Sequence, residues 1–127
     1  PINVTTNYYP GFSTDLQPGI TALATVADGD SYIRETVFED RLGHVKSLRA
    51  FGAKLSPEKD RLVIVHGPAR LKGERVKALD IRAGAACVLA GLAAEGRTSI
   101  TNLYQLDRGH TRLVERFTGL GAEIERL

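Results

Sequence analysis

The stretch TDLQPGITALATVADG (14–29) is the first clue to the architecture, because its pattern returns about 65 residues later as LDIRAGAACVLAGLAAEG (79–96). Two further echoes follow in the same order, DRLGH (40–44) to DRGH (107–110) and FGA (51–53) to LGA (120–122). Ordered echoes at a nearly constant spacing indicate an internal repeat. We therefore predict one domain, 1–127, that holds two copies of a unit, about 8–78 and about 79–127.

Hydrophobic periodicity predicts the same elements in each copy. Apolar residues recur at helical spacing ahead of a glycine, Gly29 or Gly96, that should end the helix. They are Leu16, Ile20, Leu23, Ala24 and Ala27 in the first copy, and Ile81, Ala85, Val88, Leu89 and Leu92 in the second. Further helices are expected around 45–51 and 113–120, strands at 31–38, 62–65, 75–79, 98–103 and 122–127, and a turn at 56–60. This alternation predicts an α/β (α+β) fold with helices packed against sheet.

Composition narrows the function classes. The 127 residues carry 17 Lys plus Arg against 15 Asp plus Glu, and a net charge of +2 argues against a nucleic-acid-binding tail. No apolar run approaches the ~20 residues that span a bilayer, so no membrane role is expected. The single cysteine, Cys87, fits a reducing, cytoplasmic setting, and together with three scattered histidines it offers no metal site. Because Cys87 lies on an apolar stripe, we expect a small core residue rather than a nucleophile.

Repeated polar residues mark the places where chemistry is expected. Three aspartates stand where helices should begin: Asp40, Asp80 and Asp107. Helix capping would explain an aspartate at such a position. Capping does not explain the arginines close behind them, Arg41, Arg82 and Arg108, since the N-terminal end of a helix disfavours a cation. Free helix amides beside an arginine can bind phosphate or carboxylate. An arginine in an exposed loop is, however, often only solvated, and the pattern leaves both readings open.

Asp15 follows the aromatic, glycine-containing loop YYPGFST (8–14). It is either a helix cap or a base held against a ligand hydroxyl, and the sequence leaves both open. No phosphate-binding Walker loop, dinucleotide fingerprint or nucleophile elbow is present. The residues alone therefore indicate a repeated α/β domain with candidate anion-binding arginines.

Four motifs, taken in order, carry a family resemblance: PGFSTDLQ (10–17), ETVFEDR (35–41), LDIRA (79–83) and DRG (107–109). They resemble the C-terminal part of the UDP-N-acetylglucosamine 1-carboxyvinyltransferases, the enolpyruvyl transferases that open peptidoglycan synthesis. The resemblance covers about 7–127. It implies a domain built as an inside-out α/β barrel of three repeats, of which this chain would hold two. It also implies transfer of the enolpyruvyl group of phosphoenolpyruvate to the 3-hydroxyl of UDP-N-acetylglucosamine, with release of phosphate and without a metal or organic cofactor.

The resemblance also implies roles for individual residues. Asp15 would contact the sugar 3-hydroxyl and is the candidate base that removes its proton. Val37 would contact the nucleotide sugar through its backbone, and Arg108 would bind phosphoenolpyruvate. Residues expected to line the interdomain cleft or to support the site are Arg41, Arg82, Asp80 and Thr14.

Some parts of the family's machinery lie outside this chain. The family's cysteine-bearing loop belongs to the other, N-terminal domain, and the helical context of Cys87 is wrong for that loop. We therefore expect a portion of a cytoplasmic cell-wall enzyme, linked through peptidoglycan to cell shape and division, that is inactive without its partner domain. A missing repeat should expose apolar helix faces and favour self-association.

Two other interpretations remain open. One is a fragment of the related enzyme that uses shikimate 3-phosphate, 3-phosphoshikimate 1-carboxyvinyltransferase. The other is a non-catalytic module that binds an anion or associates with partners. Turnover separates the enzyme from the module, and competition between the two acceptors separates the two enzymes.

Overall fold

Strands from the first half of the chain form one four-stranded sheet. The computed structural model describes residues 1–38 and 42–127. The strands are β1 (Asn3–Thr5), β2 (Gly29–Arg34), β3 (Lys54–Glu58) and β4 (Leu62–Gly67), in the order β1-β2-β4-β3. β1 is parallel to β2, and β4 is antiparallel to β2 and β3. Alternate residues of β2 and β4, such as Ile33, Val63 and Val65, are fully buried, so one face of the sheet forms part of the core.

A second, smaller sheet comes from the second half. β5 (Arg75–Lys77) and β6 (Ser99–Thr101) pair in parallel, with Val76 opposite Ile100. Parallel neighbours need a crossover connection, and helix α3 (Ile81–Ala93) supplies it. This unit confirms the strands expected near 75–79 and 98–103.

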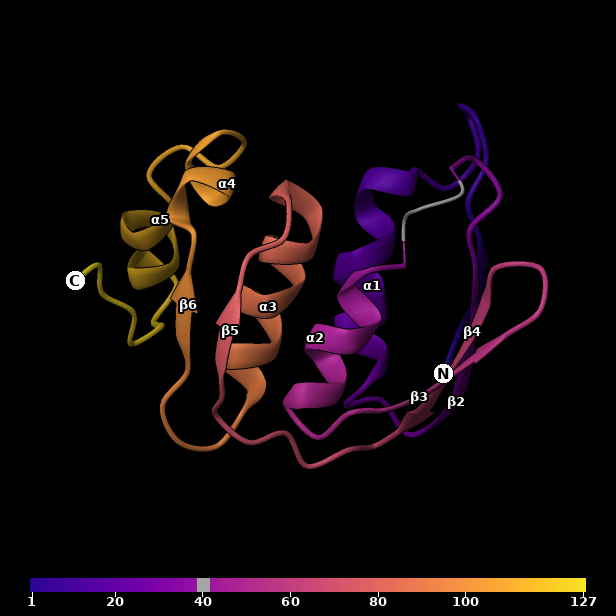
Figure 1. The fold of residues 1–127 in the computed structure, drawn as a ribbon, viewed down its shortest axis with the longest axis horizontal. Coiled ribbons are helices and arrows are strands. Elements are labelled where there is room, and N and C mark those ends of the chain that lie inside the picture. Colours follow the sequence, from indigo (N-terminus) through magenta and orange to yellow (C-terminus); the bar gives the residue numbers. More distant parts are fainter. Residues whose placement is uncertain (39–41) are drawn as a thin grey trace.

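The helices lie between and beside the two sheets. α1 (Gln17–Ala24) follows the 3-10 turn η1 (Thr14–Leu16), and α2 (His44–Ala50) follows the first sheet's β2 in the chain. α3 contacts both α1 and α2, and all three lie between the four-stranded sheet and the β5–β6 pair (Figure 1). The short helices α4 (Leu103–Asp107) and α5 (Leu113–Gly119) pack around a second core centred on Ala78, Val88 and Leu106. The mixed α/β prediction is therefore confirmed.

Two sequence predictions about the strands differ from the structure. Residues 56–60 were expected as a turn, but only 59–61 form one, because β3 runs through Pro57, which is opposite Val63. A proline is tolerated there because β3 is an edge strand. Residues 122–127 were expected as a closing strand but have no strand geometry. β3 is held by pairing along β4, whereas no strand in the described parts of the chain pairs with 122–127.

The apolar stripes expected on α1 and α3 face the core only in part. Ala24 and Val88 are buried and Ile20 packs against the core, but the leucines of both stripes are exposed. Leu16 and Leu23 are 62% and 61% exposed, while Gln17, Thr21 and Ala22 of α1 are buried. On α3 the buried residues are mostly small, and Leu89 and Leu92 are exposed. The physical reason is close packing of the two helices: a Cβ added to Gly19 of α1 would lie 3.5 Å from Leu89 Cδ1.

Small residues therefore fill the helix interface, and the larger apolar side chains form an exposed leucine face. We define this face as Leu16, Leu23, Leu89 and Leu92. Residues spaced by three, four or seven along a helix lie on one side of it, so each pair of leucines shares a helix face. None of the helices in 1–38 and 42–127 has the length and apolar character needed to cross a membrane.

The leucine face should drive self-association of the 127-residue chain, because burying apolar surface gains about 25 cal/mol per Å². We expect dimers or larger species in sedimentation velocity at micromolar concentration. The variant Leu23→Lys should be monomeric, with its free energy of unfolding nearly unchanged because Leu23 is 61% exposed. The control Leu120→Lys, at an exposed leucine outside the face, should still associate. A parent chain that stays monomeric would show that the face does not self-associate.

Candidate functional site

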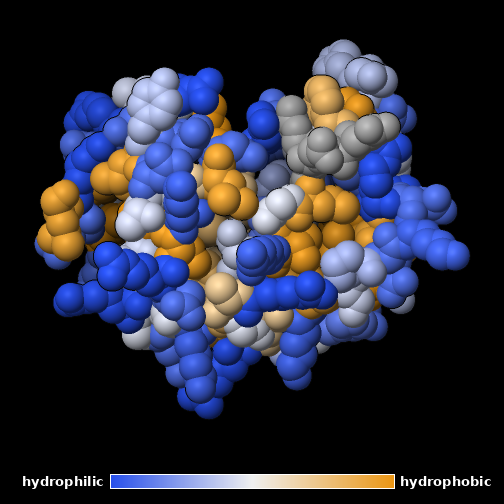
Figure 2. All heavy atoms as spheres, viewed as in Figure 1, coloured by the Kyte–Doolittle hydropathy of each residue, from blue (hydrophilic) through white to orange (hydrophobic). Residues whose placement is uncertain are grey.

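The predicted site residues gather at one end of the molecule. The starts of α1 and α3 and the short helix α4 lie at the upper end of the ribbon view (Figure 1). The space-filling outline is indented at this end, between α4 and the start of α1 (Figure 2). β5 runs into α3 and β6 runs into α4, so the loops that follow these parallel strands come to the same edge. Open α/β sheets bind ligands at such an edge.

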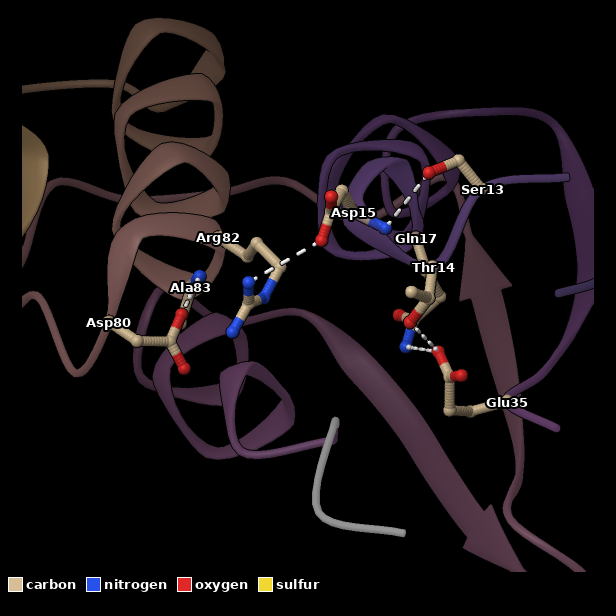
Figure 3. A network of polar contacts seen from close by, with 8 residues as sticks. All are labelled: Ser13, Thr14, Asp15, Gln17, Glu35, Asp80, Arg82 and Ala83. Carbon is tan, nitrogen blue, oxygen red and sulfur yellow. Dashed lines mark hydrogen bonds and ion pairs between the residues drawn. The ribbon is translucent and has the colours of Figure 1, made fainter. Parts of the chain in front are cut away.

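Asp15 and Arg82 meet although they lie 67 residues apart in the sequence. Arg82 Nη1 lies 3.4 Å from Asp15 Oδ1, with the guanidinium reaching from α3 toward η1 (Figure 3). The Arg82 side chain is 28% exposed and that of Asp15 is 68% exposed. Ser13 caps the turn by accepting a hydrogen bond from the Asp15 amide at 3.3 Å. Ser13 rather than Asp15 therefore caps this turn, and a role of the exposed Asp15 carboxylate toward a ligand stays a prediction.

Asp80 caps α3, as its place in the sequence predicted. Its carboxylate accepts a hydrogen bond from the Ala83 amide at 2.8 Å (Figure 3). Such a cap contributes about 0.5–2 kcal/mol. It also fixes the first turn of α3, from which Arg82 projects. Arg82 Nε is buried and has no hydrogen-bond partner among the described residues, so this donor is unsatisfied.

Glu35 is a fully buried carboxylate directly after β2. It accepts hydrogen bonds from the hydroxyls of Thr6 (2.9 Å) and Thr14 (2.8 Å) and from the Gln17 amide (3.3 Å). The backbone amides of residues 37 and 38 donate to it as well, at 3.1 and 3.2 Å. Burial by itself would raise the pKa of Glu35, but the hydrogen bonds from Thr14, Thr6, Gln17 and residue 38 hold its pKa below the usual 4.5.

Val37 is the half-buried residue that the resemblance assigns to the nucleotide sugar. Its amide donates to Glu35 Oε2, so this N–H is already used within the protein. A ligand contact through its backbone would therefore use the carbonyl oxygen. The sequence suggested the residue but contained no sign that Glu35 holds it.

Arg108 follows α4 and is exposed at the same end of the molecule. Its guanidinium stacks over the Tyr104 ring, 5.7 Å from the centroid, and Nη1 donates to Gln105 Oε1 at 3.3 Å. The preceding Asp107 is the last residue of α4 and forms an ion pair with Arg126 at 2.6 Å. The prediction that Asp107 caps a helix start was wrong. The predictions for Arg41 and Asp40 lie outside the described residues.

His44 is a functional candidate that sequence reasoning missed. It is the first residue of α2 and is buried, and its Nε2 has no partner among the described residues. Burial lowers the pKa of His44 to about 4, and the nearby carboxylates of Asp80 and Glu35 oppose that shift. The spacing of His44 gave no ligand signal, and a lone histidine at a helix start looks like a surface residue. Cys87, in contrast, is the buried core residue that was expected, and burial raises the pKa of its thiol.

Three kinds of comparison place the chain among known proteins. The family model of EPSP synthase (3-phosphoshikimate 1-carboxyvinyltransferase) matches residues 1–117. The UDP-N-acetylglucosamine 1-carboxyvinyltransferase of Thermobifida fusca is 48% identical over 99% of this chain and 29% of that protein. The enzyme of the same name from Methylobacterium radiotolerans is 51% identical over the same shares of the two chains. The chain thus spans about 30% of the length of the curated relatives it matches.

Solved structures show the same architecture. The enolpyruvyl transferase NikO from Streptomyces tendae superposes with a TM-score of 0.85, at 38% identity over 98% of this chain and 29% of that one. An EPSP synthase from Acinetobacter baumannii shares the fold alone, with a TM-score of 0.62 and 20% identity over 78% of this chain and 23% of that one. The fold is therefore that of the enolpyruvyl transferases. The chain belongs to the EPSP synthase (3-phosphoshikimate 1-carboxyvinyltransferase) family, and its curated relatives at 44–51% identity are named UDP-N-acetylglucosamine 1-carboxyvinyltransferase.

The buried, neutral His44 should make the fold sensitive to mild acid. Between pH 6.5 and about 4 the unfolded chain binds a proton at His44 that the folded chain does not bind. Stability should therefore fall as the pH falls through this window, by about 3 kcal/mol in all. We expect urea unfolding to show a loss of about 2 kcal/mol between pH 6.5 and pH 5 that is absent in His44→Gln.

The matched control for this prediction is Thr25→Val, which changes a fully buried residue that carries no titratable group. That variant should lose stability but keep the full pH dependence of the parent. If the parent and His44→Gln lose the same free energy of unfolding over this range, His44 is not a neutral buried group.

Proposed function

We propose that this chain supplies the acceptor-binding part of an enolpyruvyl transferase site. In the proposed reaction the enolpyruvyl group of phosphoenolpyruvate moves to the 3-hydroxyl of UDP-N-acetylglucosamine, the reaction that opens peptidoglycan synthesis in the cytoplasm. The observation that carries the proposal is the exposed Asp15 carboxylate, 3.4 Å from the guanidinium of the half-buried Arg82. A base and an anion-binding cation thus lie side by side at the hollowed end of the molecule.

Asp15 has the geometry of a general base. The Asp15 side chain is 68% exposed, so a substrate hydroxyl can reach its carboxylate beside Arg82. Asp15 would take the proton of the sugar 3-hydroxyl while the sugar oxygen bonds to the C2 carbon of phosphoenolpyruvate. A proton from a group outside this chain would be added to the methylene carbon. The resulting tetrahedral intermediate then loses inorganic phosphate and a proton, which restores the enol ether.

The arginines would hold the anionic donor. Arg82 keeps a buried Nε donor that no described residue uses, and the α3 start adds the positive end of a helix dipole. Arg108 is exposed on the same side of the molecule and can turn its guanidinium from Gln105 to a phosphate or carboxylate. Val37 would offer its carbonyl oxygen to the nucleotide sugar, because its amide already donates to Glu35. Arg41 is proposed for the same cleft on the resemblance alone.

The chain alone should not turn over. Its site is open on one side, and much of enzymatic rate enhancement comes from positioning both reactants in a closed site. Cys87 is fully buried, which excludes it as a group that touches substrate. In relatives the remaining 70% or so of the sequence would supply the second half of the cleft.

The proposal is tested with a chimera in which these 127 residues replace the matching segment of the Thermobifida fusca relative. We expect phosphate release from phosphoenolpyruvate that depends on UDP-N-acetylglucosamine in the chimera, and none in the chain alone. Shikimate 3-phosphate should not replace the nucleotide sugar. Asp15→Asn should lower kcat by about 10²–10⁴-fold because it removes the general base.

Asp28→Asn is the matched control, since Asp28 is an exposed aspartate beyond the opposite end of α1. It should keep the parental kcat. Full activity of Asp15→Asn would remove Asp15 from the mechanism. A folded but inactive chimera would favour a non-catalytic association module instead.

A further inference from the structure

Two different segments of the candidate site are held by the two oxygens of one carboxylate. Glu35 Oε1 accepts from the Thr14 hydroxyl at 2.8 Å and from Gln17 Nε2 at 3.3 Å (Figure 3). Glu35 Oε2 accepts from the Thr6 hydroxyl and from the amides of Val37 and residue 38. The first oxygen thus holds the turn that carries Asp15, and the second holds the loop that carries Val37.

We propose that Glu35 is a positioning residue that sets the relative geometry of the acceptor-binding loop and the base. This inference rests on the proposed function. Glu35 touches no substrate in it and acts through its neighbours. Thr14 directly precedes Asp15 in η1, so a shift of the Thr14 hydroxyl moves the turn that carries the Asp15 carboxylate. The Val37 carbonyl shares a rigid peptide plane with the Phe38 amide, and this amide donates to Glu35 Oε2 at 3.2 Å, so the carbonyl is oriented by that bond.

The bonds are strong enough to fix these positions. Glu35 is fully buried and ionised, and charge-assisted hydrogen bonds in such a place are roughly twice as strong as neutral ones. Gln17 is itself fixed, because its Oε1 accepts from the Thr21 hydroxyl at 2.9 Å. Thr6 is fixed in the same way, since its hydroxyl oxygen accepts from the Thr36 amide at 2.9 Å. The carboxylate is therefore the meeting point of β1, η1, α1 and the segment after β2.

The donors on the two oxygens of Glu35 differ in chemistry, so a substitution of Glu35 should affect the two sides differently. The Oε2 side includes two backbone amides, which can only donate. On the Oε1 side the Thr14 hydroxyl can rotate and accept a hydrogen bond. In Glu35→Gln the new amide oxygen should therefore take the Oε2 position, and the NH₂ group should face Thr14 and Gln17. The Gln17 NH₂ then meets another donor, so the Asp15 turn is displaced while the Val37 loop is kept.

The experiment is a steady-state comparison in the active chimera defined above. Glu35→Gln and Thr14→Val should lower kcat by about 10- to 100-fold, with KM for UDP-N-acetylglucosamine nearly unchanged, because they misplace the base. Thr6→Val should raise that KM by about tenfold with a smaller change in kcat, because it frees the loop that holds the nucleotide sugar. Variants on the two sides of the Glu35 carboxylate should thus differ: mainly kcat falls on the Oε1 side, and mainly KM rises on the Oε2 side.

The matched control is Thr25→Val, which removes a fully buried hydroxyl at the far end of α1. Its hydroxyl donates only within its own helix, to the Ala22 carbonyl at 2.6 Å. This variant should lose stability but keep both kinetic constants. If Thr14→Val and Thr6→Val change kcat and KM in the same way, or no more than Thr25→Val does, Glu35 is only a structural residue and the proposal fails.

The outcome also separates this inference from the proposed function. Suppose that the chimera is active and Asp15→Asn inactivates it, but Thr14→Val and Thr6→Val do not differ in their effects on kcat and KM. This result overturns the role of Glu35 alone. A chimera in which Asp15→Asn keeps full activity overturns the proposed role of Asp15, and the positioning role falls with it.

Discussion

The buried carboxylate of Glu35 is the interaction on which the candidate site depends. A lone buried charge would be costly, and it is tolerated here because five donors from four parts of the chain converge on it. Through these bonds the end of β1, the start of α1 and the segment after β2 are tied to one point. The candidate site is therefore built from loops, and the ionised Glu35 carboxylate holds these loops in place.

A second constraint is the close approach of α1 and α3. Asp15 lies in the turn just before α1, and Arg82 lies in the first turn of α3. The interface of the two helices is made of small residues, and Gly19 has Leu89 directly against it. This packing brings the two helix starts together, and with them Asp15 and Arg82 from positions 67 residues apart in the sequence. The same packing turns Leu16 and Leu23 outward. The geometry of the site and the exposed leucine face thus have one cause.

Much of the architecture could be predicted from the sequence because it depends on local periodicity. The helices at 45–51, 81–93 and 113–120 and the strands at 62–65 and 75–79 follow from apolar spacing and stopping glycines. The orientation of α1 could not be predicted in this way, because burial of Gln17 and Thr21 depends on Glu35, a partner 18 residues away from Gln17. Apolar counting assumes that polar side chains face solvent, and here they face a buried carboxylate.

The candidate site was predictable in its residue types and only partly in its geometry. The Asp80 cap follows from three neighbouring residues and was found. Ser13 rather than Asp15 caps the turn. This depends on the direction of the Ser13 hydroxyl, which the sequence does not give. Glu35 and His44 gave no sequence signal because burial, rather than spacing, makes them distinctive. The family resemblance found the right relatives but assigned no role to either residue.

The most direct test of this account is the titration of the Glu35 carboxyl carbon by NMR in the ¹³C-labelled chain. The account predicts that this carboxyl stays ionised as the pH falls to 4.5 and titrates only below that value, because its donors favour the charged form. A midpoint near or above neutral pH would mean that burial outweighs the hydrogen bonds. Glu35 would then be protonated at neutral pH and could not accept all of these hydrogen bonds, so it could not hold both segments of the site, and the account would be contradicted.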